Sequence, residues 1–167
     1  MKKLLLVSIL ILVTAGAAFA DHPKSFGIGL TGVRYQNWEG GGSWQTALSL
    51  KVPAVPIFWA IYLGIGEGYT HLYVSGDKYV LEGELVPDIN LHYYIGVGLY
   101  GMLGFYDNSD ADTLLAMGAR VPIGLSWHAV DFLEVFLALV PSLGVRVNPI
   151  HFPDGGWPFE LGVRIWF

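Results

Sequence analysis

The residues best suited to covalent chemistry lie within one short stretch, where Ser126, His128 and Glu134 occur within nine positions. A serine nucleophile needs a base within hydrogen-bond reach and an acid that orients this base. The spacing alone is weak evidence, because it also fits a histidine in a turn and a serine on the inner face of a strand. We therefore keep a lipid-modifying enzyme as an alternative and predict no catalytic residue.

The remaining histidines bear on metal binding. His71, His92 and His151 are scattered, and the five histidines of the chain lack the spacing of metal ligands. The sequence also contains no cysteine, so no disulfide framework supports the fold. We predict neither a metal site nor a cofactor.

A second set of candidates consists of charged residues isolated within apolar strands. Unpaired charges in a narrow interior are costly, so we predict an ion-pair network that blocks this interior. Arg120 and Arg164 are expected at a similar height on either side of segment 132–146. In the alternative, the same arginines line a small pore and set its ion selectivity. The predicted network comprises Lys51, Arg120, Glu134, Arg146, Glu160 and Arg164.

These residues belong to eight segments in which apolar residues occur at every second position, the pattern of a strand with one apolar face. The fourth segment is interrupted at Gly76-Asp77, which fits a bulge in one long strand or a hairpin turn. We favour the bulge. The eight segments span residues 25–35, 44–52, 57–65, 70–84, 91–105, 115–127, 132–146 and 157–167.

The second face of these segments is rich in glycine and carries only isolated charges. A soluble barrel of the lipocalin kind, which we keep as an alternative ligand binder, would show water a face rich in charged residues instead. A membrane barrel turns its apolar face to lipid, and small residues relieve crowding inside eight strands. The predicted fold is therefore all-β, a single eight-stranded antiparallel up-and-down transmembrane β-barrel.

The tryptophans support two membrane interfaces, where indole rings are favoured. One predicted girdle lies beside the glycine-rich and polar loops, and the other beside the short turns and the C-terminus. The first comprises Trp38, Trp44 and Trp157, and the second Trp59, Trp127 and Trp166.

The N-terminus has the layout of a secretory signal peptide, with a basic start, an apolar run and a small-residue ending at Ala18-Phe19-Ala20. We predict cleavage after residue 20 and one barrel domain over 21–167. This removes two lysines and changes the formal charge from −5 to −7. An acidic chain without a basic run gives no support for nucleic-acid binding, so we predict no nucleic-acid partner.

The last residues, "ELGVRIWF", resemble the C-terminal signal by which insertion machinery recognises outer-membrane barrels, with Arg164, Trp166 and Phe167 as its candidates. The stretches "HYYIGVGLYG", "GARVPIGLSW", "DFLEVFLALVPSL" and "FELGVRIWF" resemble a family of small outer-membrane barrel domains of unknown function, related in architecture to OmpW-like and OmpA-like barrels. The resemblance covers roughly residues 70–167. It implies an outer-membrane location, and strands 120–122 and 134–135 that face each other, but no chemistry.

The expected partners are outer-membrane lipid, the barrel-insertion machinery and an extracellular ligand at the outer loops. Those loops are "QNWEGGGSW", "YDNSDADT" and "NPIHFPDGGW", in which Trp38, Asp107, Asp110 and Asp112 are candidate contacts. We predict a structural or loop-mediated interaction role. Pro122 and Pro141 interrupt strands and suggest a further alternative, a lateral opening for small hydrophobic molecules.

Overall fold

The structure is a computed structural model of the 167-residue chain. It describes residues 25–34, 36, 42–106, 113–148 and 150–167. The predicted signal peptide, Trp38 and the aspartates of the loop 107–112 lie outside these residues. Within the described ranges, no helix is long and apolar enough to cross a membrane.

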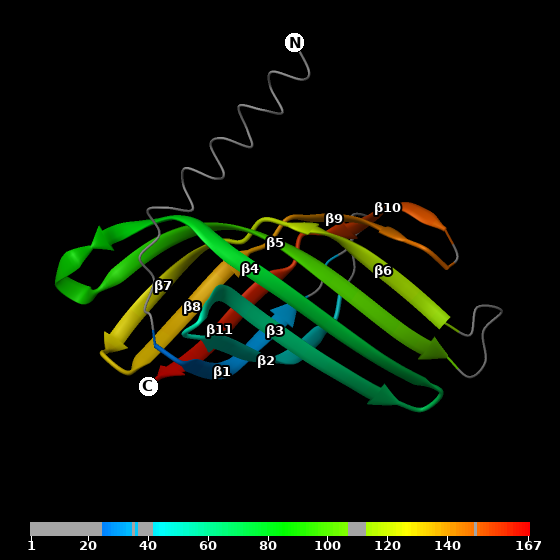
Figure 1. The fold of residues 1–167 in the computed structure, drawn as a ribbon, viewed down its shortest axis with the longest axis horizontal. Coiled ribbons are helices and arrows are strands. Elements are labelled where there is room, and N and C mark those ends of the chain that lie inside the picture. Colours follow the sequence, from blue (N-terminus) through cyan, green and yellow to red (C-terminus); the bar gives the residue numbers. More distant parts are fainter. Residues whose placement is uncertain (1–24, 35, 37–41, 107–112, 149) are drawn as a thin grey trace, which may run out of the picture.

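The described residues form one antiparallel sheet that closes into a barrel (Figure 1). Its strand segments are β1 (Gly27–Arg34), β2 (Trp44–Val52), β3 (Val55–Gly66), β4 (Tyr69–Val86), β5 (Leu91–Tyr106), β6 (Thr113–Arg120), β7 (Ile123–Val130), β8 (Leu133–Leu139), β9 (Ser142–Arg146), β10 (His151–Gly156) and β11 (Phe159–Trp166). A short 3-10 turn, η1 (Pro87–Ile89), joins β4 to β5.

The eleven segments make eight barrel strands, because three strands are each interrupted at a proline. β6 and β7 are halves of one strand, as are β8 and β9, and β10 and β11. The first break leaves the register unchanged, since β5 pairs Gly98 with Arg120 before it and Ile95 with Ile123 after it. The barrel closes where β1 pairs with β11 along its whole length. The predicted fold, an eight-stranded antiparallel barrel, is confirmed.

Hydrogen bonds continue across the proline breaks. The carbonyls of Pro122, Pro141 and Pro158 accept from the amides of Gly96, Val121 and Val140 at 2.8, 2.9 and 2.8 Å. Each proline lacks the N–H that would complete a pair of bonds. The neighbouring strands therefore remain bonded at Pro122 and Pro141, the positions at which the sequence suggested a lateral opening.

Alternation places the two faces as the sequence predicts. Residues of the glycine-rich face point inward, and the apolar residues of the other face point outward and are exposed. The C-terminus lies at one end of the barrel with the β2–β3, β4–β5 and β7–β8 connections, and we call this end the C-terminal rim. The β3–β4 turn lies at the opposite end, the loop rim (Figure 1).

Two segments differ from the predictions. β4 is continuous through Gly76 and Asp77, which pair in register with both neighbours, and its irregularities fall after Tyr79 and Glu84 instead. Asp77 therefore faces the interior and is not a turn residue. Residues 151–156, predicted as loop, form β10 against β9. This segment lacks alternation because of its proline and glycines, and its pairing depends on the neighbouring strand.

Candidate functional site: two arginine clusters inside the barrel

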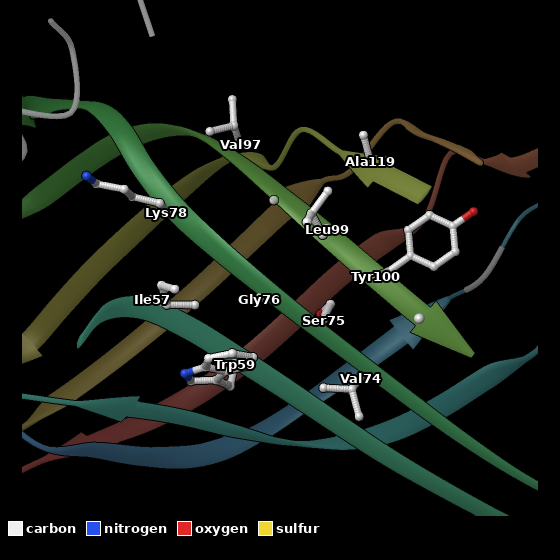
Figure 2. Close-up of a pocket in the computed structure, with 12 residues that line it drawn as sticks. Ile57, Trp59, Val74, Ser75, Gly76, Lys78, Val97, Leu99, Tyr100 and Ala119 are labelled. Carbon is white, nitrogen blue, oxygen red and sulfur yellow. The ribbon is translucent and has the colours of Figure 1, made fainter. Parts of the chain in front are cut away.

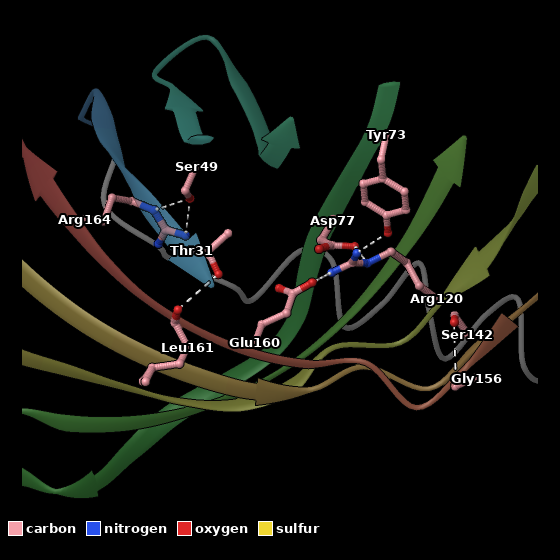
Figure 3. A network of polar contacts seen from close by, with 10 residues as sticks. All are labelled: Thr31, Ser49, Tyr73, Asp77, Arg120, Ser142, Gly156, Glu160, Leu161 and Arg164. Carbon is pink, nitrogen blue, oxygen red and sulfur yellow. Dashed lines mark hydrogen bonds and ion pairs between the residues drawn. The ribbon is translucent and has the colours of Figure 1, made fainter. Parts of the chain in front are cut away.

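The first cluster surrounds Arg120, which the end of β6 directs into the interior. Its Nη2 lies 2.6 Å from Glu160 Oε1 of β11, and its Nη1 donates to the Tyr73 hydroxyl at 2.8 Å (Figure 3). Its Nε lies 2.9 Å from Asp77 Oδ1, an ion pair without hydrogen-bond geometry. We call Tyr73, Asp77, Arg120 and Glu160 the Arg120 cluster. It joins three strands that are not neighbours in the barrel wall.

The second cluster surrounds Arg164 of β11, nearer the C-terminal rim. Its Nη1 donates to Glu134 Oε2 at 2.7 Å, and its Nε and Nη2 lie 3.2 and 3.0 Å from Ser49 Oγ. Glu134 also accepts from Ser126 at 2.8 Å and from the Trp166 indole at 3.0 Å. We call Ser49, Ser126, Glu134, Arg164 and Trp166 the Arg164 cluster. Its charged pair is fully buried.

Aromatic rings enclose the Arg164 guanidinium. Its Cζ lies 4.7 Å from the Phe58 ring centroid and 4.4 Å from that of Phe136, within the range of cation–π attraction. Phe58 in turn stacks on Tyr79, which stacks on Tyr94, with centroids 4.2 and 4.1 Å apart. These side chains fill the interior across the barrel at this height.

The structure divides the six predicted network residues. Arg120 and Glu160 meet in the first cluster, and Glu134 and Arg164 in the second. The prediction that Arg120 and Arg164 lie at the same height is wrong. In the strand register, Arg120 lies opposite Ser142 and Arg164 lies opposite Glu134. These two residues are eight positions apart along the barrel strand that β8 and β9 form. The strands that contain residues 120–122 and 134–135, which the family resemblance placed face to face, are neighbours in the barrel. The ion pair of Arg120 is nevertheless with Glu160, and Glu134 forms its ion pair with Arg164.

Arg146 and Lys51 belong to neither cluster. Arg146 Nη2 lies 2.9 Å from Asp154 of β10, near the loop rim. Lys51 Nζ donates to the carbonyl of Val52 at 3.0 Å, near the C-terminal rim. Sequence reasoning missed Asp77 and Asp154 because both stand beside glycine in stretches that resemble turns.

Ser126, His128 and Glu134 come together but not as a catalytic triad. Ser126 Oγ donates directly to Glu134, so its hydrogen is directed away from His128 Nε2, which lies 3.3 Å from the same oxygen. In a triad the histidine stands between the serine and the acid. Ser126 is also completely buried, so the arrangement serves the charged pair of the Arg164 cluster.

The tryptophans divide into two groups. Trp44, Trp127 and Trp157 are exposed on the outer surface, and Trp59 faces outward and is partly exposed. Trp166 is only 6% exposed and lies inside the barrel, so its predicted place in a girdle is wrong. It falls on the same strand face as Glu160 and Arg164. Phe167, the last residue of the predicted insertion signal, is exposed, and its amide donates to the carbonyl of Phe26 at 2.8 Å.

Lipids carrying bromine on their acyl chains should separate these two groups of tryptophans. In variants that keep a single tryptophan, we expect strong fluorescence quenching of Trp127 and little quenching of Trp166, because only the outward indole contacts acyl chains. Equal quenching of both variants would place Trp166 outside the barrel and contradict the structure.

A cavity of about 240 Å³ lies above the Arg120 cluster towards the loop rim. Its lining includes Tyr62, His71, Tyr100, Arg146 and Asp154. Tyr73 lines the cavity and also belongs to the Arg120 cluster, because its hydroxyl accepts a hydrogen bond from Arg120. The cavity and the Arg120 cluster therefore meet at Tyr73.

The fold defines the class of protein: a closed eight-stranded antiparallel β-barrel of the outer-membrane type. The chain resembles the N-terminal β-barrel domain of OprF from Pseudomonas aeruginosa, with a TM-score of 0.55 and 16% sequence identity over 86% of this chain and 98% of that one. It also aligns with Neisserial surface protein A, NspA, with a TM-score of 0.49 and 13% identity over 85% and 96% of the two chains.

No known protein family matches the sequence, and no curated protein matches it. At 16% identity, the likeness to the OprF domain shows the fold alone. The predicted resemblance to small eight-stranded outer-membrane barrels is confirmed for that fold. The likeness to OmpW-like barrels in particular stays a prediction.

Proposed function

We propose that the chain is an outer-membrane protein whose barrel is closed to ions, with a structural or interaction role and no catalytic site. The observation that carries this proposal is the pair of buried arginine clusters. Arg120 and Arg164 are each about 2% exposed, and their partners come from strands on several sides of the interior. Interiors of eight-stranded barrels are only wide enough for side chains to fill.

Three further features support membrane insertion and closure. The outward face exposes an apolar surface, which suits lipid and is unsuited to water. The loop-rim cavity meets the Arg120 cluster at Tyr73, whose hydroxyl accepts a hydrogen bond from Arg120. The sequence has a predicted signal peptide for export. A soluble lipocalin-like binder would need the opposite arrangement of apolar and polar faces.

Single-channel recording tests the proposed closure. Refolded protein comprising residues 21–167 should give no conductance steps in a planar bilayer, because both clusters stand in the path of an ion. Folding is verified first by β-sheet circular dichroism and by a heat-dependent shift in gel mobility. The control is a conducting porin in the same lipid.

A pore would give a different result. Reproducible steps from the folded protein, with an ion selectivity that changes in the Arg120→Ala variant, would overturn the closed-barrel proposal. Failure of the folded protein to insert into lipid vesicles would overturn the membrane location itself.

A further inference from the structure

The outer wall of the barrel contains a hollow of about 690 Å³ over β3, β4, β5 and β6 (Figure 2). Its outward-facing lining follows two neighbouring strands. Lys78, Gly76 and Val74 succeed one another along β4, and each pairs with its neighbour on β5, in order Val97, Leu99 and Gly101. The hollow therefore runs along the strands, from Lys78 towards the loop rim.

Small residues create this hollow. A Cβ added at Gly101 would meet no atom within 4 Å, whereas the nearest atoms to one added at Gly76 are side-chain atoms of Ile57 and Trp59 at 3.1 Å. Ala119 adds a third small residue on β6. Leu99 stands between them and is 69% exposed. The surface thus offers an elongated apolar depression with Trp59 at its border (Figure 2).

Lys78 is an unusual residue for this wall. Among the described strand residues that face outward, only Lys78 and Arg34 belong to the Lys, Arg, Asp and Glu types, and Arg34 is the last residue of β1. In the part of the chain that the structure describes, the Lys78 ammonium has no ion-pair partner. A lysine facing lipid is destabilising at the bilayer midplane and much less so near an interface. A nearby anion offsets this cost.

The position of Lys78 indicates which side the anion comes from. Lys78 adjoins Ile57, the third residue of β3, so on the β3 side only two residues and the β2–β3 turn separate it from the C-terminal rim. On the β5 side, β4 continues for eight more residues to Val86. Trp59, beside it, is an outward indole of the kind that favours the membrane interface. From Lys78 to Val74 the hollow follows β4 for four residues, or roughly 13 Å of strand, which fits an extended acyl chain.

We propose that this hollow binds an anionic phospholipid, with its phosphate on Lys78 and one acyl chain along Leu99 and Gly101. The inference rests on the proposed membrane location. Charge complementarity selects this occupant, because a neutral apolar partner leaves the ammonium without a counter-ion. The glycines let the acyl chain lie close to the backbone of the wall. The phosphate and the acyl chain are then bound by the same two strands, β4 and β5.

Native mass spectrometry of the folded protein tests the site. The probes are phosphatidylglycerol and phosphatidylcholine with identical oleoyl chains, added to protein in detergent. We expect the wild-type protein to retain phosphatidylglycerol more strongly, and Lys78→Gln to lose roughly tenfold in its affinity. Gly101→Leu should weaken retention of both lipids, since its side chain enters the hollow at a point where a Cβ meets no protein atom. Arg34→Gln is the matched control and should leave the preference unchanged.

The outcomes separate this inference from the proposed function. Folded, inserted protein whose lipid preference is the same in wild type and Lys78→Gln would overturn the phosphate site. A dimer that Gly101→Leu dissociates would show that a second copy occupies the hollow, and would also overturn it. If the wild-type protein does not insert into vesicles, the membrane location fails first.

Discussion

Replacing Glu134 with alanine should lower the free energy of unfolding by about 3–5 kcal/mol. The substitution leaves the Arg164 guanidinium buried without its carboxylate, at 2.7 Å in the native pair. It also removes the acceptor of the Ser126 hydroxyl and of the Trp166 indole. An uncompensated buried charge costs far more than the net stability that the intact pair supplies, so this loss exceeds that of a surface ion pair.

Equilibrium unfolding by urea in lipid vesicles, followed by tryptophan fluorescence, measures this cost. Ser126→Ala is the matched control, because it removes one hydrogen bond to Glu134 and leaves the charges paired. It should cost about 1–2 kcal/mol. Combining Glu134→Ala with Arg164→Met should cost less than the sum of the single changes. A cost below about 1 kcal/mol for Glu134→Ala would mean that Arg164 reaches water or another anion.

The second large effect should come from a single methyl group at the closing seam of the barrel. A Cβ at Gly29 would overlap the carbonyl oxygen of Val163 and lie 2.7 Å from the Cα of Arg164. Both are backbone atoms of the paired strand β11, so neither can rotate away. Gly29→Ala should therefore destabilise the barrel by about 3 kcal/mol, the upper end of overpacking costs.

Gly101→Ala provides the opposite result from the same chemical change. Its added methyl group meets no atom within 4 Å, and alanine loses less conformational entropy than glycine on folding. This variant should be neutral or more stable by about 0.5 kcal/mol. The urea unfolding measurement compares the two variants directly. Equal stability of the two would contradict the close approach of β1 and β11 at Gly29.

The alternation of residues was enough to predict the architecture. Every second residue in segments such as 159–166 is apolar, and that period assigns each side chain to one face. The number of turns then gives the strand count. This information is local, so it can be obtained from the sequence without knowing which strands are neighbours.

The pairing of charges is not local and was predicted less well. Arg120 and Glu160 meet because β6 and β11 both face the interior at the Arg120 cluster, although they do not pair with each other. Asp77 resembles a turn residue in "SGDK", and only the continuous register of β4 shows it as a partner of Arg120. Trp166 shows a related limit, because its position at a strand end suggested an interface while its strand face directs it inward.

The three proline breaks have a mechanical consequence. At Gly96–Pro122, Val121–Pro141 and Val140–Pro158, each cross-strand pair keeps one hydrogen bond and lacks the other, and these positions follow one another across adjacent strands. The register is unchanged, so the strands cannot slide, but resistance to bending is reduced along this line. The resistance of the barrel wall to bending therefore differs around its circumference. We expect the cross-section of the barrel to deform most easily along this line.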